Sequence, residues 1–342
     1  MKKKKRALIT GVTGQDGSYL AEHLVDMGYE VWGLMRRTSL DPYLRLREIA
    51  ASKQFHLCFG NLRDTASLAR VLAESQPDEI YNLAAQSHVG VSFKCPEETM
   101  DINYYGLGRL ITEAMKVNPK VRIYQASTSE MFGKSKPPQN EKSPLDSVTP
   151  YGESKLFAHE DYVRRYRERK GLYICAGILF NHESPRRGED FVTRKITMSL
   201  AKVKLGIIES FALGNMDSRR DWGFAGDYVR AMHLMLAQKT PKDYVIATGV
   251  NHSVRDFVEA ASNALEMPIT WKGKGLKEVG LNAEGKVIIT ISKEFFRPVE
   301  AADKYGDSSK ARRELGWKPE VSFESLAAMM AQNDFELLRK TL

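Results

Sequence analysis

Short apolar runs alternate with segments of helical periodicity through the first half of the chain. The apolar runs are bounded by polar or turn-forming residues, which is typical of buried strands, and they lie at residues 6–10, 30–35, 55–59, 79–84, 121–126 and 173–179. Between them, apolar positions recur at helical spacing, most clearly at 18–27, 65–75 and 100–117. Strands that alternate with helices build βαβ units, so the pattern predicts an α/β fold with a parallel, doubly wound sheet.

The alternation is looser beyond residue 180. Residues 190–205 and 254–265 have helical periodicity, residues 244–248 read as one more strand, and the tail mixes a short strand, an Arg-Pro loop and terminal helices. The domains that we predict are a sheet domain at 1–180 and a smaller C-terminal α/β substrate-binding domain at 181–342, from which some segments, around 220–250, return to the first.

Proline and serine crowd residues 134–150, which predicts a long loop between two regular elements. Loops longer than about 12 to 15 residues are often functional. We therefore expect this loop to border the active site.

The composition is that of a globular protein without a membrane span. Apolar residues make up 42% and charged residues 27% of the 342 positions, and no stretch approaches the roughly 18 apolar residues of a spanning helix. The basic start at residues 2–6 is not followed by the apolar segment of an export signal. The three cysteines form no C-x-x-C pair, which favours a reducing compartment. We expect a soluble, cytoplasmic protein.

The formal net charge of +8 does not by itself indicate a nucleic-acid partner. Five of the positive charges lie in the N-terminal run at residues 2–6, which leaves +3 for the rest of the chain. The remaining Lys and Arg lack the aromatic interleaving of a single-strand platform. An anionic small molecule is the partner that this balance favours.

Glycines follow the first predicted strand in the segment G-V-T-G-Q-D-G, at Gly11, Gly14 and Gly17. A glycine-rich turn between a strand and a helix lets backbone N–H groups and the helix dipole hold a pyrophosphate. A glycine triplet can also be a plain tight turn, but its place between a strand and a helix favours a dinucleotide cofactor.

Two arginines, Arg36 and Arg37, stand at the end of the second strand, and no carboxylate follows them until Asp41. An acidic residue at this position binds the ribose 2′-hydroxyl of NAD, whereas arginine accommodates the 2′-phosphate of NADP. The alternative is a solvated surface pair, but the pattern favours NADP. Residues after the third and fourth strands are placed to line the adenine and ribose: Asn61, Asp64, Ala84, Ala85 and Ser87.

Tyr151 and Lys155 are four residues apart on a predicted helix, so they share a face. A nearby ammonium lowers the pKa of a phenol, which makes this pair a usable general base. Tyr166 and Lys170 have the same spacing, but they lie about 15 residues further along the chain, beside Gly171, which is expected to end the helix. We therefore choose Tyr151.

The fifth strand runs into Thr128 and Glu130, which would point the same way if the backbone stayed extended. The carboxyl edge of an open α/β sheet is where ligands bind. Hydride transfer with a Tyr-Lys pair needs no carboxylate, so Glu130 is an additional group suited to removing a carbon-bound proton beside a ketone. Its alternative role is to cap the loop or to form a salt bridge there.

His182, Arg186 and Arg187 lie in a polar loop directly after the sixth strand, and the arginines are suited to phosphates. None of the seven histidines has metal-ligand spacing with Cys, Asp or Glu, so we expect no metal. Further candidates for binding an anion are Lys195, Arg219, Arg220 and Arg297.

Taken together, these residues resemble the GDP-mannose 4,6-dehydratases, within the extended short-chain dehydrogenase/reductases. The resemblance covers nearly the whole chain, through the motifs G-V-T-G-Q-D-G-S-Y-L, N-L-A-A-Q-S-H-V, Q-A-S-T-S-E-M-F-G, Y-G-E-S-K, G-I-L-F-N-H-E-S-P-R-R-G, F-V-T-R-K-I, R-R-D-W-G, Y-V-I-A-T-G, F-F-R-P-V-E and L-G-W-K-P. It implies a Rossmann-type fold, NADP and a homodimer or homotetramer. The chain departs from many relatives at Asn61, where they have Asp, and in the loop at residues 39–44.

The resemblance also implies the site residues. The catalytic set is Thr128, Glu130, Tyr151 and Lys155. The NADP contacts are Gly11, Thr13, Gly14, Gln15, Asp16, Gly17, Arg36, Asn61, Leu62, Leu83, Ala84, Ala85, Ser87, Tyr151, Lys155, His182 and Arg187. The nucleotide-sugar contacts are Ser87, Glu130, Asn181, Val192, Lys195, Arg220, Arg297 and Glu300.

The activity that the resemblance implies is conversion of GDP-mannose to GDP-4-keto-6-deoxy-mannose and water. The same chemistry on a GDP-manno-heptose is an alternative, because the sequence does not define the room around sugar carbon 6. A GDP-4-ketosugar reductase or epimerase is another, although it would not need Glu130. A non-catalytic dinucleotide sensor would not need to keep Tyr151, Lys155 and Glu130.

Overall fold

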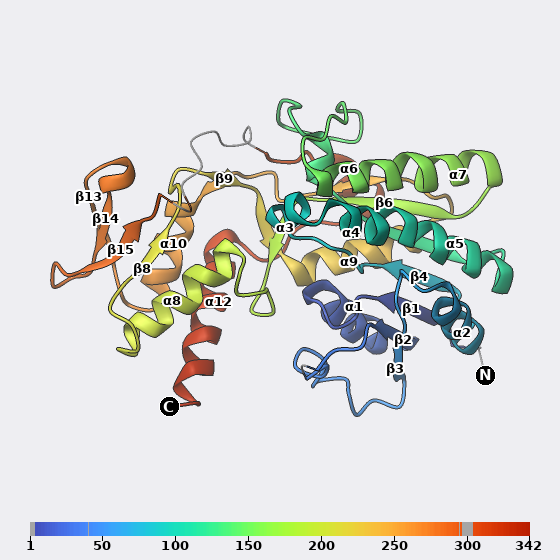
Figure 1. Ribbon diagram of the computed structural model, residues 1–342, viewed down its shortest axis with the longest axis horizontal. Helices are drawn as coiled ribbons and strands as arrows, with labels where there is room; N and C mark the ends of the chain where they lie inside the picture. The colour runs from blue at the N-terminus through green and yellow to red at the C-terminus, as the bar shows by residue number, and fades with distance from the viewer. Residues whose placement is uncertain (1–3, 40, 294, 296–303) are drawn as a thin grey trace. The chain divides into compact units, whose positions relative to one another are not determined.

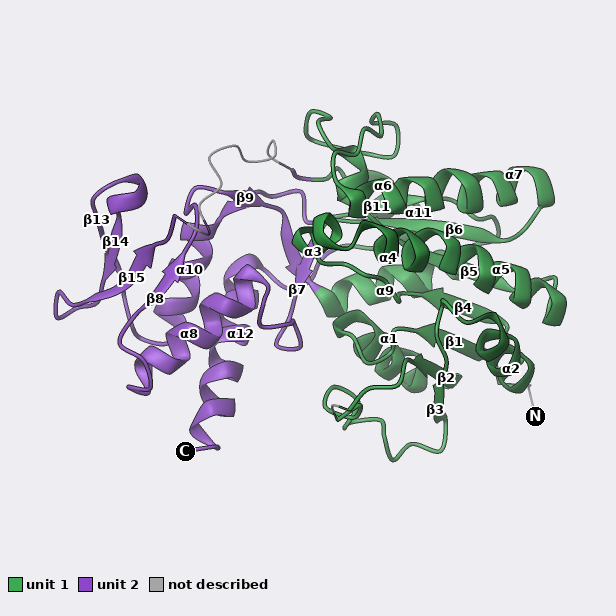
Figure 2. Cartoon of the chain, in the orientation of Figure 1, with its two compact units in different colours: residues 1–180, 225–247, 306–318 green, residues 181–224, 248–305, 319–342 purple. Residues whose placement is uncertain are grey.

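The computed structural model describes residues 4–39, 41–293, 295 and 304–342 (Figure 1). The chain forms two compact units (Figure 2). Unit 1 comprises residues 1–180, 225–247 and 306–318, and unit 2 comprises residues 181–224, 248–305 and 319–342. Residues 306–318, which the sequence analysis grouped with the later domain, therefore belong to unit 1.

Unit 1 is built on a seven-stranded, fully parallel sheet in the order β11-β6-β5-β4-β1-β2-β3 (Figure 2). The strands are β1 (Arg6–Thr10), β2 (Glu30–Met35), β3 (Phe55–Phe59), β4 (Glu79–Asn82), β5 (Arg122–Thr128), β6 (Ile174–Leu179) and β11 (Tyr244–Ile246). The chain winds outwards from β1 in one direction to β3 and then in the other direction from β4 to β11. The predicted doubly wound α/β sheet is therefore confirmed.

The strands are largely apolar on both sides because both faces of the sheet are covered. Successive side chains of a strand point to opposite faces, and in β1 Ala7 and Ile9 pack into one core cluster while Leu8 packs into the other. The first cluster includes residues of α1, α9 and α11, and the second includes residues of α2 and α5. Each fully buried Leu or Ile contributes about 1.5 to 3 kcal/mol.

The helices of unit 1 connect these strands. They are α1 (Gln15–Asp26), α2 (Thr65–Ser75), α3 (Val89–Lys94), α4 (Pro96–Met100), α5 (Gly106–Val117), α6 (Pro150–Phe157), α7 (Arg165–Lys170), α9 (Ala225–Leu236) and α11 (Ser309–Leu315), with π-helical turns η1 (Asp101–Tyr105) and η3 (Ala158–Arg164) and a 3₁₀ turn η2 (Ser129–Phe132). The stretch from η2 to α6 is irregular, as predicted for the long loop.

In the part of unit 2 that the structure describes, three helices pack with short strands around a separate core. Its helices are α8 (Val192–Lys204), α10 (Val254–Ala264) and α12 (Phe323–Arg339), with a 3₁₀ turn η4 (Gly275–Lys277). A four-stranded sheet contains β8 (Phe211–Leu213), β13 (Thr270–Lys272), β14 (Val279–Leu281) and β15 (Val287–Ile291), and two strand pairs join β7 (Asn181–Glu183) to β10 (Trp222–Phe224) and β9 (Arg219–Arg220) to β12 (His252–Ser253). Phe257 and Met330, on α10 and α12, are fully buried in this core.

Neither unit contains, among the residues described, a helix long and apolar enough to cross a membrane.

Candidate active site

The turn between β1 and α1 is so tight that it admits only glycine at two positions. A Cβ at Gly17 would lie 2.3 Å from the Gly11 carbonyl oxygen, and a Cβ at Gly11, where φ is +71°, would lie 2.9 Å from the Ala84 Cα atom. The N-terminal cap of α1 is Gly14, which supplies no capping side chain. A backbone cradle at a helix N-terminus, pressed against the end of β4, fits the pyrophosphate of a dinucleotide.

Further residues predicted to contact the cofactor lie just beyond the carboxyl ends of β1, β2, β3 and β4. Arg36 is exposed directly after β2, and Leu83 and Ala84 directly follow β4. Leu62 is different, because its side chain is buried in the core of unit 1 and its carbonyl accepts a hydrogen bond from Arg109. Residues in or beside these turns also include Thr13, Gln15, Asp16, Asn61, Ala85 and Ser87.

Asp64 has a local structural role. Its side chain caps α2 by accepting a hydrogen bond from the Ala66 N–H at 3.2 Å. The helix cap therefore explains why an aspartate stands at position 64, without a contact to the adenine or ribose.

Thr128 and Glu130 do not share an extended backbone, so that part of the prediction is wrong. The strand β5 ends at Thr128, and Glu130 lies in the 3₁₀ turn η2. The Thr128 Oγ1 atom accepts a hydrogen bond from the Glu130 N–H at 3.2 Å, which caps the turn. Such local side-chain to backbone bonds compete with the sheet ladder, so the chain turns directly after Thr128.

Tyr151 and Lys155 both lie on α6, as predicted. The helix begins at Pro150, and Thr149 caps it by accepting a hydrogen bond from the Gly152 N–H at 3.0 Å. Lys155 is 2% exposed, and its ammonium donates to the Ala126 carbonyl on β5 at 2.8 Å. Burial lowers the pKa of Lys155 to about 8, because a buried ammonium loses its hydration.

The start of α6 packs directly against the turn that carries Glu130. A Cβ at Gly152 would lie 2.9 Å from the Glu130 carbonyl oxygen and 2.1 Å from the Ser147 Oγ atom. The fold of unit 1 thus brings together the segments that carry all four predicted catalytic residues. The end of the long loop takes part, because the Asp146 N–H donates to the Met131 carbonyl at 2.9 Å.

The second tyrosine-lysine pair, Tyr166 and Lys170, lies on α7. The Lys170 ammonium is exposed and sits 4.7 Å from the centre of the Tyr166 ring. This pair is on a different part of the long helical segment from Lys155, whose ammonium contacts the end of β5.

The remaining predicted residues belong to unit 2. Asn181 and His182 are on β7, Val192 and Lys195 are on α8, and Arg220 is on β9. Arg187 forms an ion pair with Glu183 at 3.1 Å, and the Lys195 ammonium lies 3.7 Å from the centre of the Phe295 ring. Arg297 and Glu300 lie outside the described residues.

Three buried polar residues that the sequence analysis overlooked also contribute to these segments. Asn82, at the end of β4, bonds to Gln125, in the middle of β5, and Asp334 on α12 binds Arg194 on α8 through two contacts of 2.8 Å. The sequence signal for the first pair was an amide residue in each of two buried strands. The second pair joins residues 140 positions apart.

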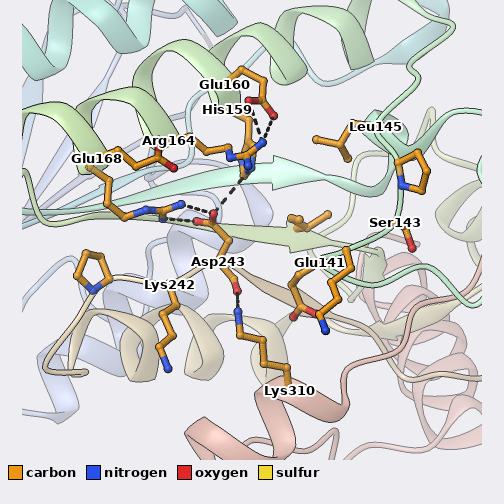
Figure 3. Close-up of a pocket in the computed structure, with 15 residues that line it drawn as sticks. Glu141, Ser143, Leu145, His159, Glu160, Arg164, Glu168, Lys242, Asp243 and Lys310 are labelled. Carbon is orange, nitrogen blue, oxygen red and sulfur yellow. Dashed lines mark hydrogen bonds and ion pairs between the residues drawn. The ribbon is translucent and has the colours of Figure 1, made fainter.

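A cavity of about 740 Å³ in unit 1 contains none of the predicted site residues (Figure 3). Its charged groups are largely paired with one another: Asp243 binds Arg167 at 2.6 Å, Glu160 binds Arg164 at 2.8 Å, and the Lys310 ammonium donates to the Asp243 carbonyl at 2.7 Å. Such a mutually satisfied network explains the polar lining without a ligand.

The family model described as GDP-mannose 4,6 dehydratase matches residues 8–330. This chain belongs to that family. It is 50% identical to the GDP-mannose 4,6 dehydratase of Drosophila melanogaster, over 98% of this chain and 87% of the relative. It is 48% identical to the GDP-mannose 4,6 dehydratase of Homo sapiens, over 99% of this chain and 93% of the relative.

Solved structures confirm the fold of this GDP-mannose 4,6 dehydratase family member. A dTDP-glucose 4,6-dehydratase from Streptomyces venezuelae, determined with NAD bound, has a TM-score of 0.80 at 24% identity over 97% of each chain. The protein RMD from Pseudomonas aeruginosa, complexed with NADPH, has a TM-score of 0.77 at 20% identity, over 97% of this chain and all of the other.

Proposed function

We propose that this protein is a GDP-mannose 4,6-dehydratase that converts GDP-D-mannose to GDP-4-keto-6-deoxy-D-mannose and water. The observation that carries the proposal is the family match over residues 8–330, with relatives of that name at about half identity over nearly the whole chain. The turn that carries Glu130 and the start of α6 pack together in unit 1, which supports the same chemistry.

The cofactor is a nicotinamide dinucleotide held by the glycine turn, and we further propose that it is NADP. When bound, this group would supply the hydride acceptor and donor for an internal transfer from sugar carbon 4 to carbon 6. Arg36, exposed directly after β2, would pair with a 2′-phosphate, and no carboxylate that could bind a free 2′-hydroxyl lies between Arg37 and Asp41. Arg187 and His182 are further candidates for cofactor contact.

The residues of α6 and β5 would act on the sugar 4-hydroxyl. Tyr151 acts as a phenolate, which the nearby Lys155 ammonium stabilises, and removes the hydroxyl proton, so that it becomes a neutral phenol. The Thr128 hydroxyl hydrogen-bonds to the same sugar oxygen. Oxidation at carbon 4 creates a ketone, which makes the hydrogen on carbon 5 acidic.

Glu130 supplies the step that a simple dehydrogenase does not need. Its carboxylate removes the proton from carbon 5, and the same residue then carries a proton to the departing hydroxyl on carbon 6. The elimination of water thus leaves Glu130 as it began, and the proton that Tyr151 took from the 4-hydroxyl balances the proton that carbon 5 gains when hydride adds at carbon 6. The nucleotide part of the substrate would be bound by residues of unit 2, Asn181, Val192, Lys195 and Arg220, together with Arg297 and Glu300.

The reaction consumes no external reductant, which defines the test. Purified protein is incubated with GDP-mannose and no added reductant, and the nucleotide-sugar products are identified by mass spectrometry. We expect a product that has lost one water, and we expect Lys155→Met to form almost none. Unchanged GDP-mannose, with turnover of a GDP-manno-heptose or a GDP-4-ketosugar instead, would transfer the assignment to those alternatives.

A further inference from the structure

A continuous row of buried side chains joins the carboxyl ends of β1 and β4 to the middle of β5. The Thr10 hydroxyl donates to the Asn82 Oδ1 atom at 2.7 Å, and the Asn82 amide donates to the Gln125 Oε1 atom at 2.7 Å. The Gln125 amide then donates to the Ala126 carbonyl at 2.9 Å. Thr10 and Gln125 are fully buried and Asn82 is 2% exposed, so this row belongs to the interior of unit 1.

The direction of every bond in the row is determined by its first member. The Thr10 hydroxyl oxygen accepts two backbone N–H groups, those of Leu83 and Ala84, each at 3.1 Å. Backbone N–H groups can only donate, so the single hydroxyl proton is directed to Asn82. Asn82 must then present its amide nitrogen to Gln125, and Gln125 must present its own amide nitrogen to Ala126.

The row ends on the same carbonyl that holds Lys155. The Ala126 oxygen accepts the Gln125 amide at 2.9 Å and the Lys155 ammonium at 2.8 Å. A carbonyl oxygen has two lone pairs, so these two donors occupy both of its acceptor positions. The Gln125 amide fixes the direction of the Ala126 carbonyl. The NH₂ group of this amide, which is the positive end of the amide dipole, lies beside the Lys155 ammonium because both donate to the same oxygen.

We propose that Gln125, oriented by Asn82 and Thr10, is a positioning residue that fixes the Ala126 carbonyl and thereby the place and charge of the Lys155 ammonium. This inference rests on the proposed function, in which Lys155 supports Tyr151. It connects the turn at residues 83–84, a proposed cofactor contact, to the proposed catalytic helix α6.

The electrostatic setting of Lys155 agrees with this role. Its pKa is lowered to about 8, and burial alone accounts for the shift among the groups that the structure describes. The elements packed against α6 carry charged side chains or histidine at Lys94, Glu97, Glu98, Asp101, Arg122, Glu130, His159, Glu160, Asp161 and Arg164. None of these side chains contributes to the lowered pKa of Lys155. The neutral groups that can adjust the charge of Lys155 are therefore the Ala126 carbonyl and the Gln125 amide bonded to it.

The first test is the pH profile of kcat in Gln125→Glu and Gln125→Met. Loss of the Lys155 proton ends its support of Tyr151, so the basic limb of the profile reports this lysine. An opposite charge nearby shifts a pKa by about 1 to 3 units. We expect Gln125→Glu to move the basic limb upwards by about this much, and Gln125→Met to move it in the same direction by less.

Separate measurement of kcat and KM distinguishes a positioning role of Gln125 from a role in binding the substrate or cofactor. Because Gln125 has no place among the proposed ligands, we expect both variants to lower kcat at neutral pH by about tenfold, within the range of general-base effects, and to leave KM within about twofold. Thr10→Val should lower kcat in the same way, because it removes the hydroxyl that orients Asn82. Thr10→Ser keeps that hydroxyl and should restore the profile of the unmodified protein.

A second test needs no activity. The pKa of Lys155 is about 8 in the folded chain against 10.5 for a free lysine, so the folded state binds fewer protons between these values. The free energy of unfolding should therefore rise from pH 8 to 10.5, relative to Lys155→Met. Gln125→Glu should flatten this rise.

The outcomes separate the inference from the proposed function. If Gln125→Glu and Gln125→Met lower the melting temperature while the basic limb, kcat and the rise in unfolding free energy stay unchanged, Gln125 is merely structural and the inference is overturned. If Lys155→Met itself dehydrates GDP-mannose at the normal rate, the proposed function of Lys155 fails instead.

Discussion

The Cα atom of Gly152 faces the carbonyl oxygen of Glu130 so closely that a Cβ at position 152 would lie 2.9 Å from that oxygen. The second close atom, the Ser147 Oγ at 2.1 Å, belongs to a side chain that can rotate away. The Glu130 carbonyl is backbone and cannot. This contact sets the separation between α6 and the turn that carries Glu130.

Gly152→Ala should therefore displace α6 from that turn. A misplacement of about 1 Å can lower a rate by about 10²-fold, so we expect kcat to fall by about tenfold to hundredfold while the melting temperature changes less. The control is Ser147→Ala, which should be nearly neutral. If the double variant Ser147→Ala/Gly152→Ala regains full activity, the Ser147 side chain sets the restriction and the Glu130 carbonyl does not.

Arg36 should determine the choice of cofactor. A charge-assisted hydrogen bond contributes about 1.5 to 3 kcal/mol, so Arg36→Ala should reduce the preference for NADP over NAD by about tenfold to hundredfold. Titration of cofactor-free protein with each dinucleotide measures this preference. Arg36→Lys keeps the charge and should retain part of it. Equal affinity of the unmodified protein for both cofactors would contradict the assignment.

A pair of histidines should make the stability of unit 1 depend on pH. The His23 Nε2 and His233 Nδ1 atoms are 3.1 Å apart, and burial lowers the pKa of both from 6.5. The neighbouring His233 lowers the pKa of His23 further, whereas Glu79 opposes the effect of burial at His233. The folded state therefore binds fewer protons than the unfolded state just below pH 6.5. This contribution to stability is complete above pH 6.5 and is lost as the pH falls through the lowered values.

Urea unfolding across this pH range checks the prediction. His233→Gln should flatten the decline, because it leaves His23 without a second imidazole. A decline of the same slope in His233→Gln and in the unmodified protein would show that other groups cause it.

The ion pair between Arg194 and Asp334 should hold the loop that carries Arg187. The Arg194 guanidinium also donates to the carbonyls of Pro185 and Arg187. Removing one partner of a buried pair costs about 3 to 5 kcal/mol, so Asp334→Asn should lower the free energy of unfolding by up to this amount and should raise KM for the nucleotide sugar.

A matched control lies on the same helix. The exposed pair of Glu336 and Arg339, at 2.7 Å, should contribute less than about 1 kcal/mol, so Glu336→Gln should change neither quantity measurably. If Asp334→Asn unfolds as easily as predicted but keeps a normal KM, the pair stabilises unit 2 without positioning the loop.

The sequence predicts the sheet well because its signal is local. An apolar run such as residues 6–10 must be buried on both faces, and the place of the glycines at 11, 14 and 17 between a strand and a helix favours a dinucleotide site over a plain tight turn. The position of Tyr151 and Lys155 on one helix follows from the same kind of local pattern.

The interpretations that failed or were missed depend on contacts that periodicity does not encode. The Thr128 side chain bends the chain before Glu130 through one hydrogen bond, whereas the pattern alone suggested a continuing strand. Asp334 and Arg194 meet across 140 positions. A helical pattern shows which face is buried, but it does not show which helix covers that face.

Glu130 carries the distinction between a dehydratase and a dehydrogenase, and one variant tests it. Glu130→Gln keeps the size of the side chain and removes the base, so removal of the carbon 5 proton should slow by about 10² to 10⁴. In a single turnover with GDP-mannose, the variant should accumulate the absorbance of reduced nicotinamide, whereas the unmodified protein should show almost none. Dehydration of GDP-mannose by Glu130→Gln at the normal rate, with no such absorbance, would contradict the account.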